Sequence, residues 1–104
     1  MQDTDQYRKM GEVYSLIPKG KKNAAPLRSI ASAAHLTVRS LKAVVLDITL
    51  SGHPIAGTQS GYYIPATLTE WNEYRAYLKA RKESTEARYK AVDNYIMHNY
   101  GGRA

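Results

Sequence analysis

The sequence contains no cysteine, no phenylalanine and only one tryptophan. Without cysteine the chain has no disulfide, no thiolate zinc site and no cysteine nucleophile, which suits a reducing compartment. No stretch approaches the roughly 20 consecutive apolar residues that cross a bilayer, and the first ten residues lack the apolar run of a signal peptide. These absences predict a single small cytoplasmic domain with no membrane partner.

Acidic residues are scarce in the middle of the chain. Residues 18–66 hold six basic residues against Asp47 alone, a net charge of +5, whereas residues 1–17 carry −1 and residues 67–104 carry +2, for a total of +6. Positive charge attracts a polyanion such as the phosphate backbone of DNA, and it also keeps small proteins in solution. On charge alone both interpretations stay open.

Helical patterns of apolar residues recur three times in the first half of the chain. We expect one helix from a cap at Asp3 or Thr4 through residue 17, a second over residues 26–34 and a third from a cap at Thr37 to a stop at Gly52. The side chains expected to face the core are Tyr7, Met10, Tyr14 and Ile17 in the first helix and Leu41, Val45 and Ile48 in the third.

A two-stranded ribbon is predicted after the third helix, with strands over residues 53–56 and 61–64 and a tip over residues 57–61. Alternation places Tyr62 and Ile64 toward the core and Tyr63 toward solvent. Helix, turn, helix and hairpin is the layout of a winged helix-turn-helix, a unit that holds its third helix against duplex DNA.

A capping box, Thr67 with Glu70 three residues later, starts the last helical stretch. No proline or glycine follows until Gly101, but the pattern weakens in the middle, so two segments with a break near Ser84-Thr85 are expected. The prediction is a mainly α fold with a small β-hairpin. Residues 1–66 form the winged helix-turn-helix domain, and residues 67–104 form a helical extension that packs on it, mediates a homodimer, or both.

The candidate DNA contacts fall into three groups. Side chains at the front of the third helix are expected to enter the major groove of double-stranded DNA: Arg39, Ser40 and Lys42. Cations of the second helix and of a flexible loop over residues 19–23 are expected to hold phosphates: Lys19, Lys21, Lys22 and Arg28, helped by Ser29 and Ser32. The wing tip flanks them: Thr58, Gln59 and Ser60.

The third helix also turns apolar residues outward, namely Val38, Val44, Leu46 and Leu50. A helix that is apolar on nearly all sides is usually buried. The C-terminal helix or a second copy of the chain can therefore cover this surface. That possibility supports an alternative function, a protein-interaction module with the same layout that binds a host or phage protein through this face and the tyrosine-rich C-terminal helix.

Residues that would support catalysis are sparse. His35, His53 and His98 lie in different predicted elements, no paired carboxylates suggest acid–base chemistry, and no glycine loop cradles a phosphate. We therefore expect no enzyme, no metal, no cofactor and no small-molecule substrate. Four tyrosines are expected in the core (Tyr7, Tyr14, Tyr62 and Tyr74), and four on contact surfaces (Tyr63, Tyr77, Tyr89 and Tyr100).

Four segments carry a resemblance to a known family: Leu16–Ala24, Thr37–Leu41, Ser51–Ile55 and Ser60–Ile64. Together with the Arg81-containing helix, over roughly residues 10–82, they resemble small winged-helix proteins encoded by phages and prophages of Gram-positive bacteria. More distantly, they are similar to the N-terminal DNA-binding domain of the biotin repressor. The resemblance implies a phage DNA-binding protein in the host bacterial cytoplasm that regulates transcription or replication. The run Ala43–Leu46 departs from the more polar recognition helices of that family.

Overall fold

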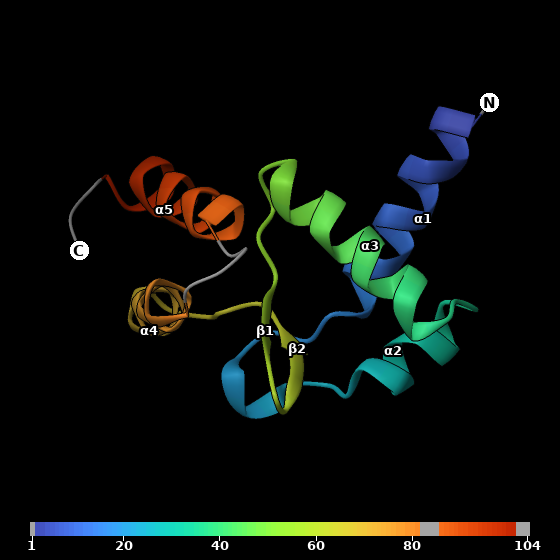
Figure 1. The fold of residues 1–104 in the computed structure, drawn as a ribbon, viewed down its shortest axis with the longest axis horizontal. Helices are drawn as coiled ribbons and strands as arrows, with labels where there is room; N and C mark the ends of the chain where they lie inside the picture. Colours follow the sequence, from blue (N-terminus) through green and yellow to red (C-terminus); the bar gives the residue numbers. More distant parts are fainter. Residues whose placement is uncertain (1, 82–85, 102–104) are drawn as a thin grey trace.

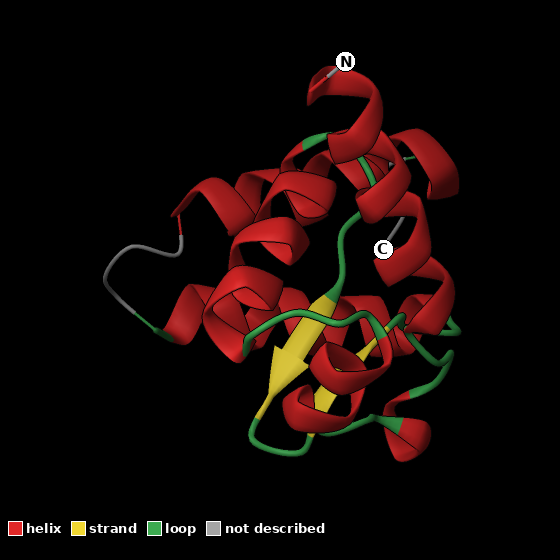
Figure 2. Ribbon diagram, turned by 90° about the vertical axis from the view of Figure 1, so that its right-hand side faces the viewer, coloured by secondary structure: helices red, strands yellow, loops and turns green. Residues whose placement is uncertain are grey.

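The structure, a computed structural model, describes residues 2–81 and 86–101. These residues are mainly helical and include one small antiparallel hairpin, which lies between α1–α3 on one side and α4–α5 on the other (Figure 1). Figure 2 shows how short the two strands are beside the helices. The elements are α1 Gln2–Leu16, η1 Lys21–Asn23, α2 Leu27–Ala33, α3 Val38–Leu50, β1 Ala56–Thr58, β2 Gly61–Tyr63, α4 Leu68–Ala80 and α5 Glu86–Tyr100.

The first core cluster joins α1, α2 and α3. Val13, which the sequence analysis did not select, is fully buried in it, whereas Tyr7 is 69% exposed, so the predicted position of Tyr7 in the core is wrong. Tyr7 lies beside Ser51 and His53, where α3 has ended and no helix continues alongside to cover it. The start of α1 also differs, because the helix begins at Gln2 and the expected cap residues lie inside it.

The third helix follows its prediction closely. The Thr37 hydroxyl accepts a hydrogen bond from the Ser40 backbone N–H at 3.0 Å, which caps the helix. At the other end Gly52 adopts a φ of 110°, and the N–H groups of Gly52 and His53 bond to the carbonyls of Thr49 and Ile48, which is a Schellman motif. The predicted core residues of this helix are all buried: Leu41, Val45 and Ile48.

The hairpin is shorter than predicted, and its first strand starts later. Strand β1 begins at Ala56 rather than His53, and the turn between the strands consists of Gln59 and Ser60 only. Pro54 has no N–H for a ladder, and the N–H of Ile55 donates to the Thr49 hydroxyl at 3.3 Å instead. Residues 53–55 therefore pass over the end of α3 before pairing begins.

The neighbouring tyrosines of β2 face opposite sides of the hairpin, as predicted, but the side that was expected to face solvent is buried. Tyr63 is only 2% exposed and packs in a second core cluster with Trp71 and Tyr74. Tyr62 is half-buried against the first cluster, and Ile64 touches both clusters. The predictions of Tyr63 as a solvent-facing ring and as a contact surface are therefore wrong. Helices cover both faces of this hairpin, whereas the prediction assumed one wet face.

The second edge of β2 is also occupied. The backbone of Tyr62 exchanges two hydrogen bonds with Ala25 (2.9 and 3.0 Å), and Ile64 accepts from Gly20 and donates to Pro18, both at 2.8 Å. The basic loop, which was predicted to be flexible, is thus held against the hairpin at both of its ends. Its middle forms the short helix η1. An edge strand left bare would invite pairing with another chain, and this loop covers it.

The C-terminal stretch forms two helices, as the weak middle of its pattern suggested. Helix α4 starts after the Thr67 cap and ends at Ala80, and α5 begins at Glu86, while the predicted break position at Ser84-Thr85 lies outside the described residues. The helices run antiparallel, since the rings of Trp71 and Tyr95 are 4.6 Å apart and Arg75 pairs with Asp93 at 2.8 Å. None of the described helices is long and apolar enough to cross a bilayer.

Gly61 should be essential for the stability of the hairpin. It adopts a φ of 125°, and a methyl group there would overlap the carbonyl of Ala25. We expect Gly61→Ala to cost at least about 2 kcal/mol of unfolding free energy, measured by urea denaturation. The matched control is Gly11→Ala in α1, where an added methyl meets nothing within 4 Å; it should gain about 0.5–1 kcal/mol. Equal effects of the two changes would contradict this account of the loop–hairpin junction.

Because of Tyr63, the free energy of unfolding should vary with pH in the alkaline range. Burial, followed by the negative charge of Glu70, raises the pKa of Tyr63 from 10.0 to about 12. Below pH 10 the hydroxyl is protonated in the folded and unfolded chain, so its contribution to stability is fully present there. Between about pH 10 and 12 the unfolded chain loses the proton more readily, so stability falls. Urea denaturation of Tyr63→Phe across this range should show a shallower decline than that of the unaltered chain; identical slopes would refute the assignment.

Candidate functional site

The front of α3 presents two cations to solvent. Because the buried Leu41 lies on the core side of the helix, Arg39 and Lys42 project from the other side, one turn apart, and both are exposed. Neither makes a hydrogen bond or ion pair with any residue that the structure describes. Ser40 is exposed between them. This end of the helix is open, with its positive charge uncompensated.

The opposite end of α3 is covered by the C-terminal helix. Thr49 and Leu50 line a small hollow together with Ala91, Tyr95 and other residues of α5. The covering is incomplete, since Leu50 is still 51% exposed. The sequence predicted that the C-terminal helix could cover the apolar outer surface of the third helix. In the structure it covers part of that surface, and it leaves Arg39 and Lys42 exposed.

The cations of the basic loop are not equivalent. The Lys21 ammonium lies 3.7 Å from the Glu73 carboxylate on α4, so a carboxylate already faces part of its charge. Lys19 and Lys22 are exposed, and Asn23 steadies the loop by donating to the Lys19 carbonyl at 2.9 Å. Two of the three lysines predicted to hold phosphates thus have no acidic partner among the described residues.

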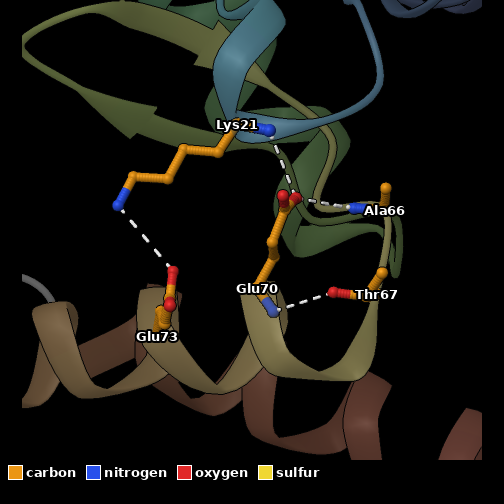
Figure 3. A network of polar contacts seen from close by, with 5 residues as sticks. All are labelled: Lys21, Ala66, Thr67, Glu70 and Glu73. Carbon is orange, nitrogen blue, oxygen red and sulfur yellow. Dashed lines mark hydrogen bonds and ion pairs between the residues drawn. The ribbon is translucent and has the colours of Figure 1, made fainter.

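Figure 3 shows how α4 is tied to this loop. One oxygen of Glu70 accepts hydrogen bonds from the backbone N–H of Lys21 at 3.2 Å and of Ala66 at 3.0 Å, and the Thr67 hydroxyl accepts from the Glu70 N–H. The predicted capping box is thus present in altered form, because the carboxylate reaches Ala66, one residue before the cap. The same carboxylate fixes the loop to the start of α4.

The hairpin turn separates two hollows. Ser60 lines a shallow one with Lys19, Lys21 and Lys22, while Thr58 and Gln59 line another with Lys42. The Thr58 hydroxyl also accepts from the Ser60 N–H at 3.3 Å, so it is partly used within the turn. The remaining predicted contacts lie on α2 and line neither hollow: Arg28, Ser29 and Ser32, all exposed.

The hollow beside Lys42 is a groove of about 500 Å³ between α3, the hairpin and the α4–α5 pair. We call it the tyrosine groove because three tyrosines line it. The lining residues used below are Lys42, Tyr62, Tyr74, Tyr77, Arg81 and Arg88. Three of them are cationic, and its described lining contains no carboxylate. The sequence thus predicted Lys42 as a site residue, but it did not predict the groove that Lys42 lines.

Arg88 of α5 lines this groove together with Tyr62 and Tyr74. Burial raises the pKa of Tyr62 and of Tyr74, and the nearby positive charge of Arg88 offsets part of that rise in both. For Tyr74 a backbone hydrogen bond from Gly57 acts in the same direction. Arg88 thus lines the groove together with both tyrosines, and its positive charge acts on both hydroxyls.

Sequence reasoning missed Arg88 as a site residue, and no local signal could have found it. It lies 46 positions after Lys42, and the two line one groove because α5 folds back along α4. Tyr77 was expected on a contact surface, and at 37% exposed it remains accessible there. Among the described residues no group of three His, Asp or Glu side chains is placed to hold a metal ion.

Glu70 and Glu73 allow a matched test of this junction. Glu70→Ala removes an acceptor shared by two backbone N–H groups, so we expect it to cost about 1–2 kcal/mol of unfolding free energy. Glu73→Ala breaks only an exposed ion pair and should change stability by less than about 0.5 kcal/mol. Thermal denaturation followed by circular dichroism compares the two. A larger loss for Glu73→Ala would show that the ion pair, rather than the carboxylate–backbone bonds, holds the loop.

Comparison of the chain with protein-family models, with curated proteins and with solved structures finds no match.

Proposed function

We propose that the chain is a winged helix-turn-helix protein that binds double-stranded DNA, with α3 in the major groove and the β1–β2 hairpin as its wing. The observation that carries this proposal is the open front of α3, where Arg39 and Lys42 are exposed and lack an acidic partner in the part of the chain that the structure describes. Major-groove recognition commonly uses such cations near the start of a helix.

The other exposed cations support the same orientation. Lys19 and Lys22 lie on the loop that is hydrogen-bonded to β2, and Arg28 lies on α2, the helix that precedes α3. In this proposal they contact phosphates on either side of α3. Lys21 contributes less, because Glu73 compensates part of its charge. The turn residues Gln59 and Ser60 offer hydrogen bonds but no charge.

A role in regulating phage transcription or replication, inside a bacterial host, completes the proposal. Its support is the sequence resemblance to small phage winged-helix proteins. A homodimer through α5 is not needed for it, because Val92 and Ile96, two apolar residues of α5, are fully buried in the core cluster that contains residues of the chain's own α4 and hairpin.

The alternative is a protein-interaction module with the same fold. The observation in its favour is Leu50, which is large, apolar and 51% exposed beside α5. Such a module would bind its partner protein through the apolar face of α3 and the tyrosine-rich C-terminal helix, and it would not bind duplex DNA sequence-specifically. A binding assay with mixed duplexes, run beside light scattering with the partner, separates the two functions.

The decisive test for DNA binding is a salt series with duplexes selected from phage and random DNA. Arg39→Ala should weaken binding to the selected sequence by about 1–3 kcal/mol and binding to bulk DNA by less. Lys42→Ala should reduce the slope of log affinity against log salt by about 1. Gel-shift titrations measure both quantities.

Lys90→Ala is the matched control, since Lys90 is an exposed cation of α5 that is paired with Glu86 at 3.5 Å. It should leave the affinity and the salt slope unchanged. An affinity that does not depend on salt, or equal losses in all three variants, would count against docking through α3.

A further inference from the structure

Arg88 in the tyrosine groove is a cation that has no partner among the residues the structure describes. It is half-buried, and no described residue pairs with it or accepts a hydrogen bond from it. The other half-buried cations in the described part of the chain are paired: Lys9 with Glu12 at 3.1 Å and Arg75 with Asp93 at 2.8 Å. A charge partly removed from water is normally paired, so the surroundings of Arg88 suit an anion supplied from outside.

The charged side chains in the described lining of the groove are all positive. Lys42 and Arg81 line the same groove, and no carboxylate is found in its described lining. Tyr62 and Tyr74 line the same groove, and their hydroxyls are protonated at neutral pH because the ordinary pKa of tyrosine is about 10 and burial raises it further in both. Arginine and lysine side chains with neutral O–H donors around them form a suitable environment for a phosphate group.

One wall of the groove is a column of flat groups on α4. The rings of Tyr74 and Tyr77 are nearly parallel, with their centroids 5.9 Å apart and 19° between their planes. The guanidinium of Arg81 lies over the Tyr77 ring at 5.4 Å and donates to its hydroxyl. Aromatic rings and arginine planes of this kind hold nucleic-acid bases by stacking, without regard to sequence.

The size of the groove limits what can enter it. A volume of about 500 Å³ lies in the range of small-ligand sites and far exceeds the space that a single phosphate needs. A duplex cannot enter it, because its bases are stacked and paired inside the helix. An unpaired nucleotide brings both a phosphate for the cations and a base for the rings.

We propose that the tyrosine groove holds an unpaired nucleotide of single-stranded DNA, with its phosphate near Arg88 and Lys42 and its base against the tyrosine wall. This site goes beyond docking of duplex DNA and does not require it. The two surfaces adjoin at Lys42 and at the hairpin turn, so DNA with a single-stranded extension can occupy both at once.

The test measures fluorescence anisotropy of three labelled DNAs with the full chain: a short single strand, the blunt duplex of the same sequence, and that duplex with an overhang. The single strand should bind, and the overhang should improve affinity over the blunt duplex. Arg88→Gln should weaken single-strand binding about 5-fold or more and remove the advantage of the overhang, while blunt-duplex binding stays unchanged. Arg88→Lys, which keeps the charge, should retain part of the single-strand affinity.

A second variant guards against misfolding, because Arg88 is half-buried. Tyr77 is 37% exposed, so Tyr77→Leu should leave the core intact and still weaken single-strand binding. Circular dichroism confirms the fold of each variant, and Lys90→Gln serves as the charge control. Two residues along a helix turn by about 200°, so Lys90 points away from the groove side of α5.

Several results would overturn the inference: no single-strand binding by the unaltered chain, undiminished binding by folded Arg88→Gln, or the same loss for single strand and blunt duplex. Thymidine monophosphate that binds as tightly as the single strand would show a free-nucleotide site instead. Failure of duplex docking has a different signature, because Arg39→Ala would then have no effect while binding of single strands would still depend on Arg88.

Discussion

The central strand β2 is only three residues long, yet all four of its sides are occupied. One edge pairs with β1, and the other exchanges backbone hydrogen bonds with the segment over residues 18–25. One face lies against the core of α1–α3 through Tyr62, and the other lies in the core of α4–α5 through Tyr63. Strand β1, the segment over residues 18–25 and both core clusters therefore all contact this strand. The absence of a side chain at Gly61 permits the closest of these contacts.

The placement of charge follows from that arrangement. Because the loop is fixed to β2 and the start of α4 is fixed to the loop through Glu70, the Lys21 side chain is brought to Glu73 and loses part of its attraction for anions. Because α4 and α5 pack on the far face of the hairpin, they leave the front of α3 open and bring Arg88 near Lys42. The cations that remain uncompensated are therefore not simply those of the most basic segment.

The candidate site could be predicted only where it depends on a single helix. Arg39 and Lys42 lie on the outer side of α3 because Leu41, Val45 and Ile48 face inward, and that spacing is visible in the sequence. Lys21 pairs with Glu73, and Lys42 lines the same groove as Arg88, although the residues of each pair are about fifty positions apart in the sequence. These arrangements depend on how the helices pack, and neither the periodicity nor the charge counts of the sequence carry that information.

The sequence by itself determined the helices, the caps at Thr37 and Thr67, and the inward stripe of α3, because these depend on hydrogen bonds and spacings within a few residues. Tertiary structure decided that both faces of the hairpin are covered, and it thereby buried Tyr63, which was expected to face solvent, while Tyr62 packs against the first core cluster. Alternation along a strand separates two faces but does not say what lies on each. Tyr63 is buried because α4 and α5 pack together and form a second core over the hairpin. That packing depends on contacts between distant parts of the chain.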